Sequence, residues 1–116
     1  MKKTHQGYRA FDLEIWPETN NLVRNDTVVH VEPLVMAMLV YLIEHKSHIV
    51  SKEELLKALW PGRVVSDNAL HRIIGQLRKV LDDDPLNPRF IRTVKKKGSV
   101  FVAEVTPLNS KAIIKR

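Results

Sequence analysis

The side chains best suited to bind a partner lie between residues 66 and 81, in the segment SDNALHRIIGQLRKVL. Its polar positions carry hydrogen-bond donors with long side chains and no carboxylate: His71, Arg72, Gln76 and Lys79. Arginine and glutamine can bond base edges in the major groove of DNA, and basic side chains can bond phosphates. A solvated helix face would have the same composition, so this segment alone leaves both interpretations open.

A helix must carry these donors, and the sequence predicts one over residues 66–81. Apolar residues recur at the spacing that lines one helix face, at Leu70, Ile74, Leu77 and Leu81. Ser66 can cap the first turn through its hydroxyl, and Asp67 adds negative charge where the helix dipole favours it. The run Asp82-Asp83-Asp84-Pro85 ends the helix. Consecutive carboxylates diverge, so this run predicts a solvated loop and not a cation site.

Positive charge is concentrated after this helix. Residues 1–84 hold 11 Lys and Arg against 12 Asp and Glu, whereas residues 85–116 hold 8 against 1. Two β-like runs, Phe90–Val94 and Val100–Val105, flank Lys95-Lys96-Lys97-Gly98-Ser99 and predict a hairpin in which glycine supplies the unusual backbone angle. Such segregation favours a local contact with a polyanion. Lys111, Lys115 and Arg116 fit a solvated tail equally well.

The first half of the chain predicts a meander of strands followed by two helices. A half-buried strand begins at Tyr8 and ends at Trp16-Pro17, and shorter strands follow at 22–23 and 28–31, with Asn20-Asn21 and Asn25-Asp26 as turns. A helix over residues 33–45 is apolar nearly all round. Because Val35 and Val40 lie beside its main stripe, either it is covered on two sides or part of it is a contact surface.

A second helix begins with a capping box at Ser51 and Glu54, in which each side chain would satisfy the other's backbone amide. It places Leu55, Leu56 and Leu59 inward and ends near Trp60-Pro61-Gly62. The short connection to the helix over 66–81 predicts a helix-turn-helix, whose second member enters a groove.

Composition excludes several classes of protein. A chain of 116 residues suits one domain, predicted over residues 8–105, with a disordered segment 1–7 and a linker 106–116. Without cysteine there is no disulfide, Cys-based zinc site or thiol catalysis. The longest apolar run has ten residues, Leu34 to Ile43, too short to cross a bilayer, and no export signal precedes it, so we expect this domain in the cytoplasm.

No motif for an enzyme is present. The sequence has no glycine-rich phosphate loop, no His-Glu-x-x-His and no serine in a nucleophile elbow. His45 and His48 could hold a metal ion, but no third ligand is evident, which favours surface histidines. We therefore expect no enzymatic activity, cofactor, metal ion or small-molecule substrate.

A helix-turn-helix followed by a basic hairpin is the element order of a winged helix. The motifs VSDNAL, LRK, DDP-x-NP and I-x-TV make the chain resemble the winged-helix DNA-binding domain of OmpR/PhoB-type bacterial transcription regulators, in particular the membrane-anchored one-component regulators of the CadC and ToxR type. The resemblance covers residues 8–105. It implies an α+β fold with a four-stranded N-terminal antiparallel sheet, three helices and a C-terminal β-hairpin wing over residues 92–101.

The resemblance also implies roles for individual residues. Those facing the major groove or its flanking phosphates would be Asn68, His71, Arg72, Gln76 and Arg78. In the wing, Thr93 would lie near a phosphate and Lys95 in the minor groove, and charge adds Lys79, Lys96 and Lys97 to the DNA-binding set. The connection between the second and third helices would contact RNA polymerase through Pro61, Gly62, Arg63, Val64 and Val65.

The implied function is sequence-specific binding of double-stranded promoter DNA, as a dimer or as tandem copies. A membrane span and a sensor would lie beyond residue 116. Gly75 departs from the family because a basic residue is common there, and the wing lacks the usual tyrosine. Together with the apolar first helix, Gly75 motivates an alternative: a protein-interaction winged helix with weak or lost DNA binding, which acts through a partner regulator.

Overall fold

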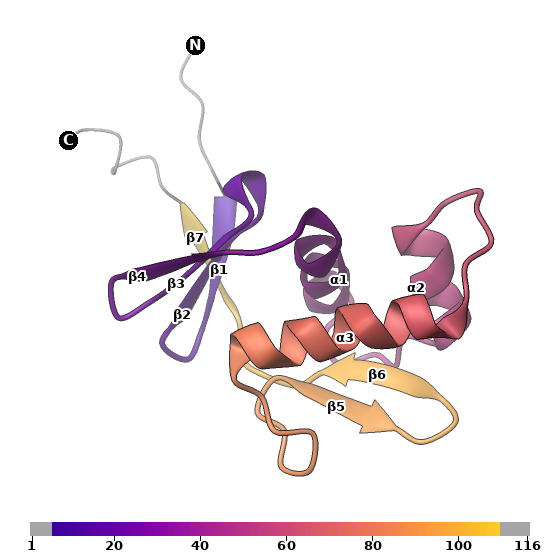
Figure 1. Ribbon diagram of the computed structural model, residues 1–116. Coiled ribbons are helices and arrows are strands. Elements are labelled where there is room, and N and C mark those ends of the chain that lie inside the picture. The colour runs from indigo at the N-terminus through magenta and orange to yellow at the C-terminus, as the bar shows by residue number, and fades with distance from the viewer. Residues whose placement is uncertain (1–5, 110–116) are drawn as a thin grey trace. The chain divides into compact units, whose positions relative to one another are not determined.

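The computed structural model describes residues 6–109, which divide into two compact units (Figure 1). The sheet unit comprises residues 6–32 and 104–109, and the helix–wing unit comprises residues 33–103. Within the described residues, none of the helices is both long and apolar enough to cross a membrane.

The sheet unit is one antiparallel sheet of five strands in the order β4-β3-β2-β1-β7. Alternating side chains bury one face, as Ile15 pairs with Leu22 and Ala10 pairs with Leu13. The short 3-10 helix η1, Pro17–Thr19, connects β2 to β3. The strands are β1 Gln6–Ala10, β2 Leu13–Trp16, β3 Asn21–Arg24, β4 Thr27–His30 and β7 Thr106–Asn109.

Turn chemistry explains where these strands reverse. Asn25 and Asp26 both have positive φ, at 51° and 65°, as a two-residue hairpin turn requires, so the turn predicted there is confirmed. The single strand predicted from Tyr8 to Trp16 is wrong: the chain reverses at Phe11, whose φ is 56°, and forms the hairpin β1–β2. The alternation of apolar and polar residues continues through this tight turn, so the sequence pattern alone does not reveal that the chain reverses there.

Both predicted flanking segments are corrected in part. Gln6 and Gly7 belong to β1, although residues 1–7 were expected to be disordered. Thr106–Asn109 forms β7 and pairs with β1 along its whole length, although 106–116 was expected to be a linker. Main-chain bonds to an open sheet edge order this short polar segment, which has no apolar pattern of its own. Lys111, Lys115 and Arg116 lie outside the described residues.

The helix–wing unit contains the three predicted helices, α1 Pro33–Glu44, α2 Lys52–Leu59 and α3 Asp67–Leu81. In α1 the two valines beside the main apolar stripe are covered at least in part: Val35 is 2% exposed and Val40 is half-buried. At the start of α2 the Ser51 hydroxyl accepts from the Glu54 amide at 3.0 Å, as predicted. The carboxylate of Glu54 instead accepts from the Tyr41 hydroxyl of α1, and this hydrogen bond raises the pKa of Tyr41. The reciprocal half of the capping box is therefore replaced by a link between two helices.

The wing, residues 91–101, is a hairpin of β5 Ile91–Val94 and β6 Gly98–Phe101. Its second strand is earlier and shorter than the predicted run 100–105. Ser99 also pairs with Val50 of the α1–α2 connection, through Val50 N–H to Ser99 O at 2.7 Å and Ser99 N–H to Val50 O at 2.9 Å. Backbone hydrogen bonds thus hold the wing against the α1–α2 connection of its own unit.

Candidate nucleic-acid interface

Backbone hydrogen bonds define where helix α3 begins and ends. Ser66 occupies the predicted N-cap position, but within the described chain its hydroxyl makes no capping hydrogen bond; its carbonyl accepts from Ala69 N–H at 3.1 Å instead. At the C-terminus, Asp82 adopts φ 59°, and the amides of Asp82 and Asp83 donate to Lys79 O and Arg78 O. This pair of bonds is a Schellman motif, which ends the helix and turns the following residue sharply.

The amphipathic pattern of α3 is confirmed, with one change. Leu70, Leu77 and Leu81 are buried as predicted, and Ile73 is buried in place of Ile74, which is half-buried. The polar face remains accessible: Asn68, His71, Arg72 and Lys79 are exposed, and Gln76 is half-buried. On this face Arg72 Nη1 donates to Gln76 Oε1 at 3.4 Å.

An ion pair ties the first turn of α3 to α2. Lys52 Nζ lies 2.8 Å from Asp67 Oδ2, and both side chains are about half exposed, at 46% and 51%. This hydrogen bond lowers the pKa of Asp67 and raises that of Lys52. Because the pair is exposed, its contribution to stability is small. Its main consequence is that the negative charge of Asp67, in the first turn of α3, is paired with a cation of α2.

Two hollows connect α3 with its surroundings. One, of about 430 Å³, lies between α2, α3 and the wing, and its polar rim includes His71, Lys96 and Lys97. The other, of about 640 Å³, follows the outer face of α3 past Arg72, Gln76 and Lys79. His71 lines both. The donors of α3 and two lysines of the wing therefore border one continuous surface of the helix–wing unit.

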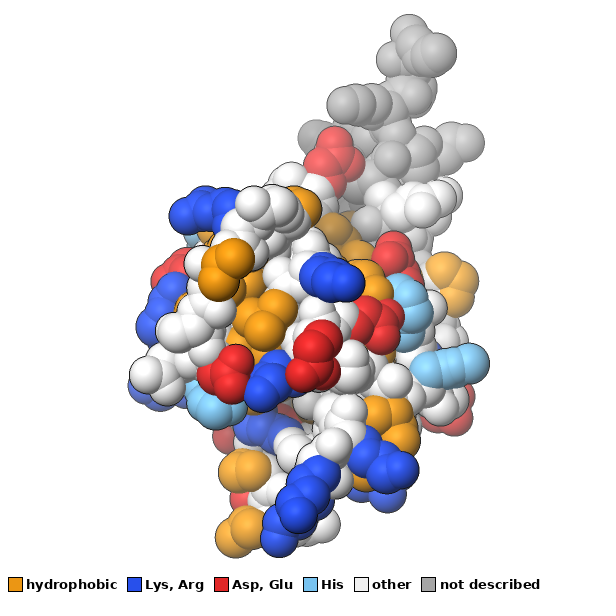
Figure 2. Space-filling model, turned by 90° about the vertical axis from the view of Figure 1, so that its right-hand side faces the viewer, with side chains coloured by type: hydrophobic (Ala, Val, Ile, Leu, Met, Phe, Trp, Pro, Cys, Tyr) orange, Lys and Arg blue, Asp and Glu red, His pale blue; other side chains and the backbone are white. Residues whose placement is uncertain are grey.

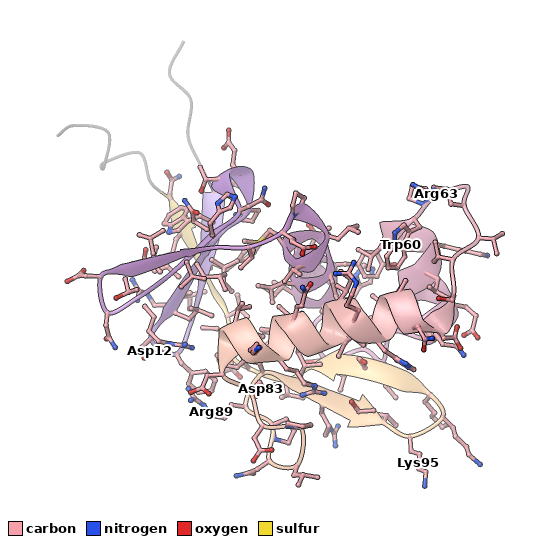
Figure 3. All side chains as sticks on the ribbon, viewed as in Figure 1. Asp12, Trp60, Arg63, Asp83, Arg89 and Lys95 are labelled. Carbon is pink, nitrogen blue, oxygen red and sulfur yellow. The ribbon has the colours of Figure 1, made fainter. Side chains whose placement is uncertain are left out.

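The turn of the wing carries the other predicted cations. Lys95, Lys96 and Lys97 are all exposed, and Lys96 has φ 62°, so a lysine shares the left-handed backbone that was expected of glycine alone. Lys95 extends away from the hairpin in Figure 3, and neither hollow has Lys95 or Asn68 in its lining. In Figure 2, Lys and Arg side chains gather at the lower part of the face, whereas acidic and basic side chains mix above them.

Arg78 differs from the other predicted contacts because its guanidinium is largely enclosed. Its side chain is 11% exposed, and Nη1 lies 3.3 Å from the Asp83 carboxylate and 2.9 Å from Ile91 O. Its Nη2 donates to Thr93 Oγ1 at 2.9 Å, at the exposed surface of β5. Arg78 and Thr93 were predicted separately, and the structure brings them together.

Sequence reasoning missed Asp83. The run 82–84 was expected to be a solvated loop, which is wrong for its middle residue: the Asp83 side chain is fully buried. Its carboxylate accepts hydrogen bonds from three successive backbone amides, those of Arg89, Phe90 and Ile91, at 2.7, 3.1 and 3.0 Å. The only sequence signal was the motif DDP-x-NP, which contains Asp83 and Asp84 but does not show which of the two is buried.

The two histidines that could have held a metal ion and the predicted polymerase-contact connection lie in different surroundings. His45 Nδ1 lies 2.8 Å from Tyr41 O and its ring stacks on Tyr41, while His48 is exposed. Within residues 6–109, no three His, Asp or Glu side chains converge as metal ligands. The α2–α3 connection is prominent: Pro61 to Val64 are exposed, with Val64 completely so.

Comparison with known proteins identifies the family. Residues 26–101 match the family model described as "Transcriptional regulatory protein, C terminal". The transcriptional activator CadC of Escherichia coli is 32% identical over 98 residues, which cover 84% of this chain and 19% of CadC. The transcriptional regulator HilA of Salmonella typhimurium is 35% identical over 92 residues, which cover 79% of this chain and 16% of HilA. The chain thus spans less than one fifth of the length of these relatives.

Solved structures agree with this result. The DNA-binding domain of Escherichia coli CadC superimposes with a TM-score of 0.78 at 28% identity, covering 90% of this chain and 98% of that one. The Klebsiella pneumoniae RstA DNA-binding domain, solved in complex with the RstA box, gives 0.71 at 28% identity and covers 83% and 96%. The matched family consists of regulator domains and not of enzymes. The chain therefore belongs to the family of DNA-binding domains of transcriptional regulatory proteins, with the OmpR/PhoB-type winged-helix fold.

Proposed function

We propose that this chain binds promoter DNA by inserting α3 into the major groove while the wing reaches the adjacent backbone and minor groove. The observation that carries this proposal is the shared surface: His71 of α3 and Lys96 and Lys97 of the wing line the same hollow. A helix and a basic arm on one face can contact a groove and its flanking phosphates together.

The residues divide into two roles. Those that read bases are His71, Arg72 and Gln76, because they are donors on the accessible face of α3 and can reach base edges. Those that position the domain on the backbone are Asn68, Arg78, Lys79, Thr93, Lys96 and Lys97, and Lys95 enters the minor groove. Arg78 and Thr93 act as one unit, since Arg78 Nη2 donates to Thr93 Oγ1 and leaves the hydroxyl hydrogen of the exposed Thr93 available to a phosphate.

Salt dependence tests the proposal. If the exposed cations Lys79, Lys96 and Lys97 each neutralise one phosphate, the three contacts give a slope of log K against log salt near −2.7. Fluorescence anisotropy with a promoter duplex between 50 and 300 mM salt measures this slope. A slope close to zero would contradict the proposal.

The alternative, a protein-interaction domain with lost DNA binding, has less support. It needed the apolar side of α1 as a contact surface, but Val35 is 2% exposed and Val40 is half-buried. Gly75 leaves the polar face of α3 accessible, and the cations on either side of it remain.

The partners implied by the resemblance follow from two features. One helix and one wing cover little DNA, so useful occupancy needs two copies on neighbouring half-sites, as a dimer or in tandem. The exposed Val64 in the connection 61–65 suits a contact with RNA polymerase. On a two-site promoter we expect Val64→Asp to abolish activated transcription in vitro while two copies still bind in ultracentrifugation. Unchanged transcription, or a single bound copy at saturation, would contradict these assignments.

The full-length protein is proposed to be anchored in the inner membrane, with this domain in the cytoplasm. The support is the similarity to CadC, of which the matched region is 19%, and the resemblance to membrane-anchored one-component regulators. Fractionation of cells that express the full-length protein tests the anchor: recovery in the soluble fraction would contradict it.

A further inference from the structure

The junction between α3 and the wing is organised by a buried carboxylate that the proposed DNA contacts do not use. Asp83 follows the Schellman motif of α3 directly, so the sharp turn at Asp82 directs its side chain inward (Figure 3). The side chain has no exposed area. A buried charge of this kind is stable only when it is paired and fully hydrogen-bonded.

Both oxygens of Asp83 are bonded to the chain that leads into β5. Oδ1 accepts from the amides of Arg89 and Phe90, and Oδ2 accepts from the amide of Ile91. Three successive amides pointing at one carboxylate fix the direction in which the wing leaves the turn 84–88. Asp83 therefore sets the start of the wing relative to the end of α3.

The same carboxylate holds Arg78. Nη1 of Arg78 is shared between Asp83 Oδ2 and Ile91 O, so the planar guanidinium is oriented and Nη2 is directed at Thr93 Oγ1. A planar fork held at one end presents its other end in a fixed direction. The chain of contacts thus runs from the C-terminus of α3 through Asp83 and Arg78 to the exposed edge of β5.

We propose that Asp83 is a positioning residue that couples the wing to α3, so that wing lysines reach phosphates only when α3 occupies its groove in the correct register. The inference rests on the proposed DNA-binding function and deepens it. Asp83 touches no DNA itself. Its effect is to hold Arg78, Thr93 and the wing turn in one geometry with the reading face of α3.

A double-mutant cycle tests the coupling in the full chain of 116 residues. In the wild-type background, replacing Lys96 and Lys97 by alanine removes two phosphate contacts and is expected to lower DNA affinity roughly 60-fold at 0.1 M salt. In an Asp83→Asn background the same replacement is expected to cost less than about 5-fold, because the amide cannot accept from every donor and the wing leaves its position. Binding is measured by anisotropy, with the concentration of active protein determined by titration.

Asp84→Asn is the matched control. It removes the same charge one residue away, where the exposed carboxylate accepts from Leu86 N–H at 3.0 Å. In this background the lysine replacement is expected to keep its full cost. A purely structural role for Asp83 would lower the fraction of folded protein and leave the cost of the lysine replacement at about 60-fold.

Arg78→Lys provides a second route if Asp83→Asn does not fold. Lysine keeps the positive charge but cannot bond Asp83, Ile91 O and Thr93 together, so the cost of the lysine replacement should again fall. If replacing Lys96 and Lys97 lowers DNA affinity by the full 60-fold or so in the Asp83→Asn or the Arg78→Lys background, the coupling is wrong although the chain still binds DNA. If the wild-type chain shows no salt-dependent affinity for DNA, the proposed function and the coupling both fall.

Discussion

Replacing Gly98 by alanine is expected to destabilise the helix–wing unit by about 3 kcal/mol or more, from backbone strain and overpacking together. A Cβ at this position would lie 2.1 Å from Val50 O, 2.7 Å from Val50 C and 2.9 Å from Ser51 Cα, all of them backbone atoms. The φ of Gly98 is also +147°, a backbone angle that residues with a side chain rarely adopt. Relief would require separating β6 from Val50, and the two hydrogen bonds between Ser99 and Val50 would then be lost.

Gly75→Ala is the control, because it is expected to change the free energy of unfolding in the opposite direction. A Cβ there meets no heavy atom within 4 Å, and the residue lies in the middle of α3. Alanine should therefore stabilise the chain by about 1 kcal/mol through helix propensity. Urea unfolding followed by circular dichroism measures both variants. Equal midpoints for Gly98→Ala and the wild type would mean that the wing does not lie against the α1–α2 connection as described.

The sequence predicted the helices well because their signals are local. Apolar residues at helical spacing located α3 almost to the residue, and the turn residues Asn25 and Asp26 located the hairpin β3–β4. Strand β7 has no such signal. It forms because the edge of β1 accepts it, and pairing between residues about 100 positions apart is invisible to a local pattern.

The sequence indicated which side chains of α3 are exposed, but not the hydrogen bonds that join the end of α3 to the wing. Exposure of the donors on α3 followed from amphipathicity, since residues off the apolar stripe face solvent. Which of three adjacent aspartates is buried depends on the left-handed backbone at Asp82, and a run of three identical residues gives no signal of which one adopts it. The same backbone turn decides that Arg78 is held inside while its neighbour Lys79 is exposed.

Replacing Lys95, Lys96 and Lys97 by alanine is expected to weaken binding to all DNA sequences about equally, roughly 60-fold at 0.1 M salt if two of them contact phosphates. The salt slope should become less negative by about 1.8 for the same reason. All three side chains are exposed and belong to a turn that is closed by backbone bonds, so the fold should persist. Lys57→Ala is the control for loss of positive charge in general, because Lys57 is an exposed lysine of α2 outside both hollows, and it should leave DNA affinity nearly unchanged.

Gln76→Ala should behave differently from the wing variant. Because Gln76 lies on the reading face and accepts from Arg72, its loss should change which bases are preferred, at about 1–3 kcal/mol for a lost base contact, with little effect on the salt slope. Binding of each variant to a randomised duplex library, followed by sequencing of the bound fraction, separates the two effects. If the wing variant alters base preference as strongly as Gln76→Ala does, the wing takes part in reading, and the division between positioning and reading residues is wrong.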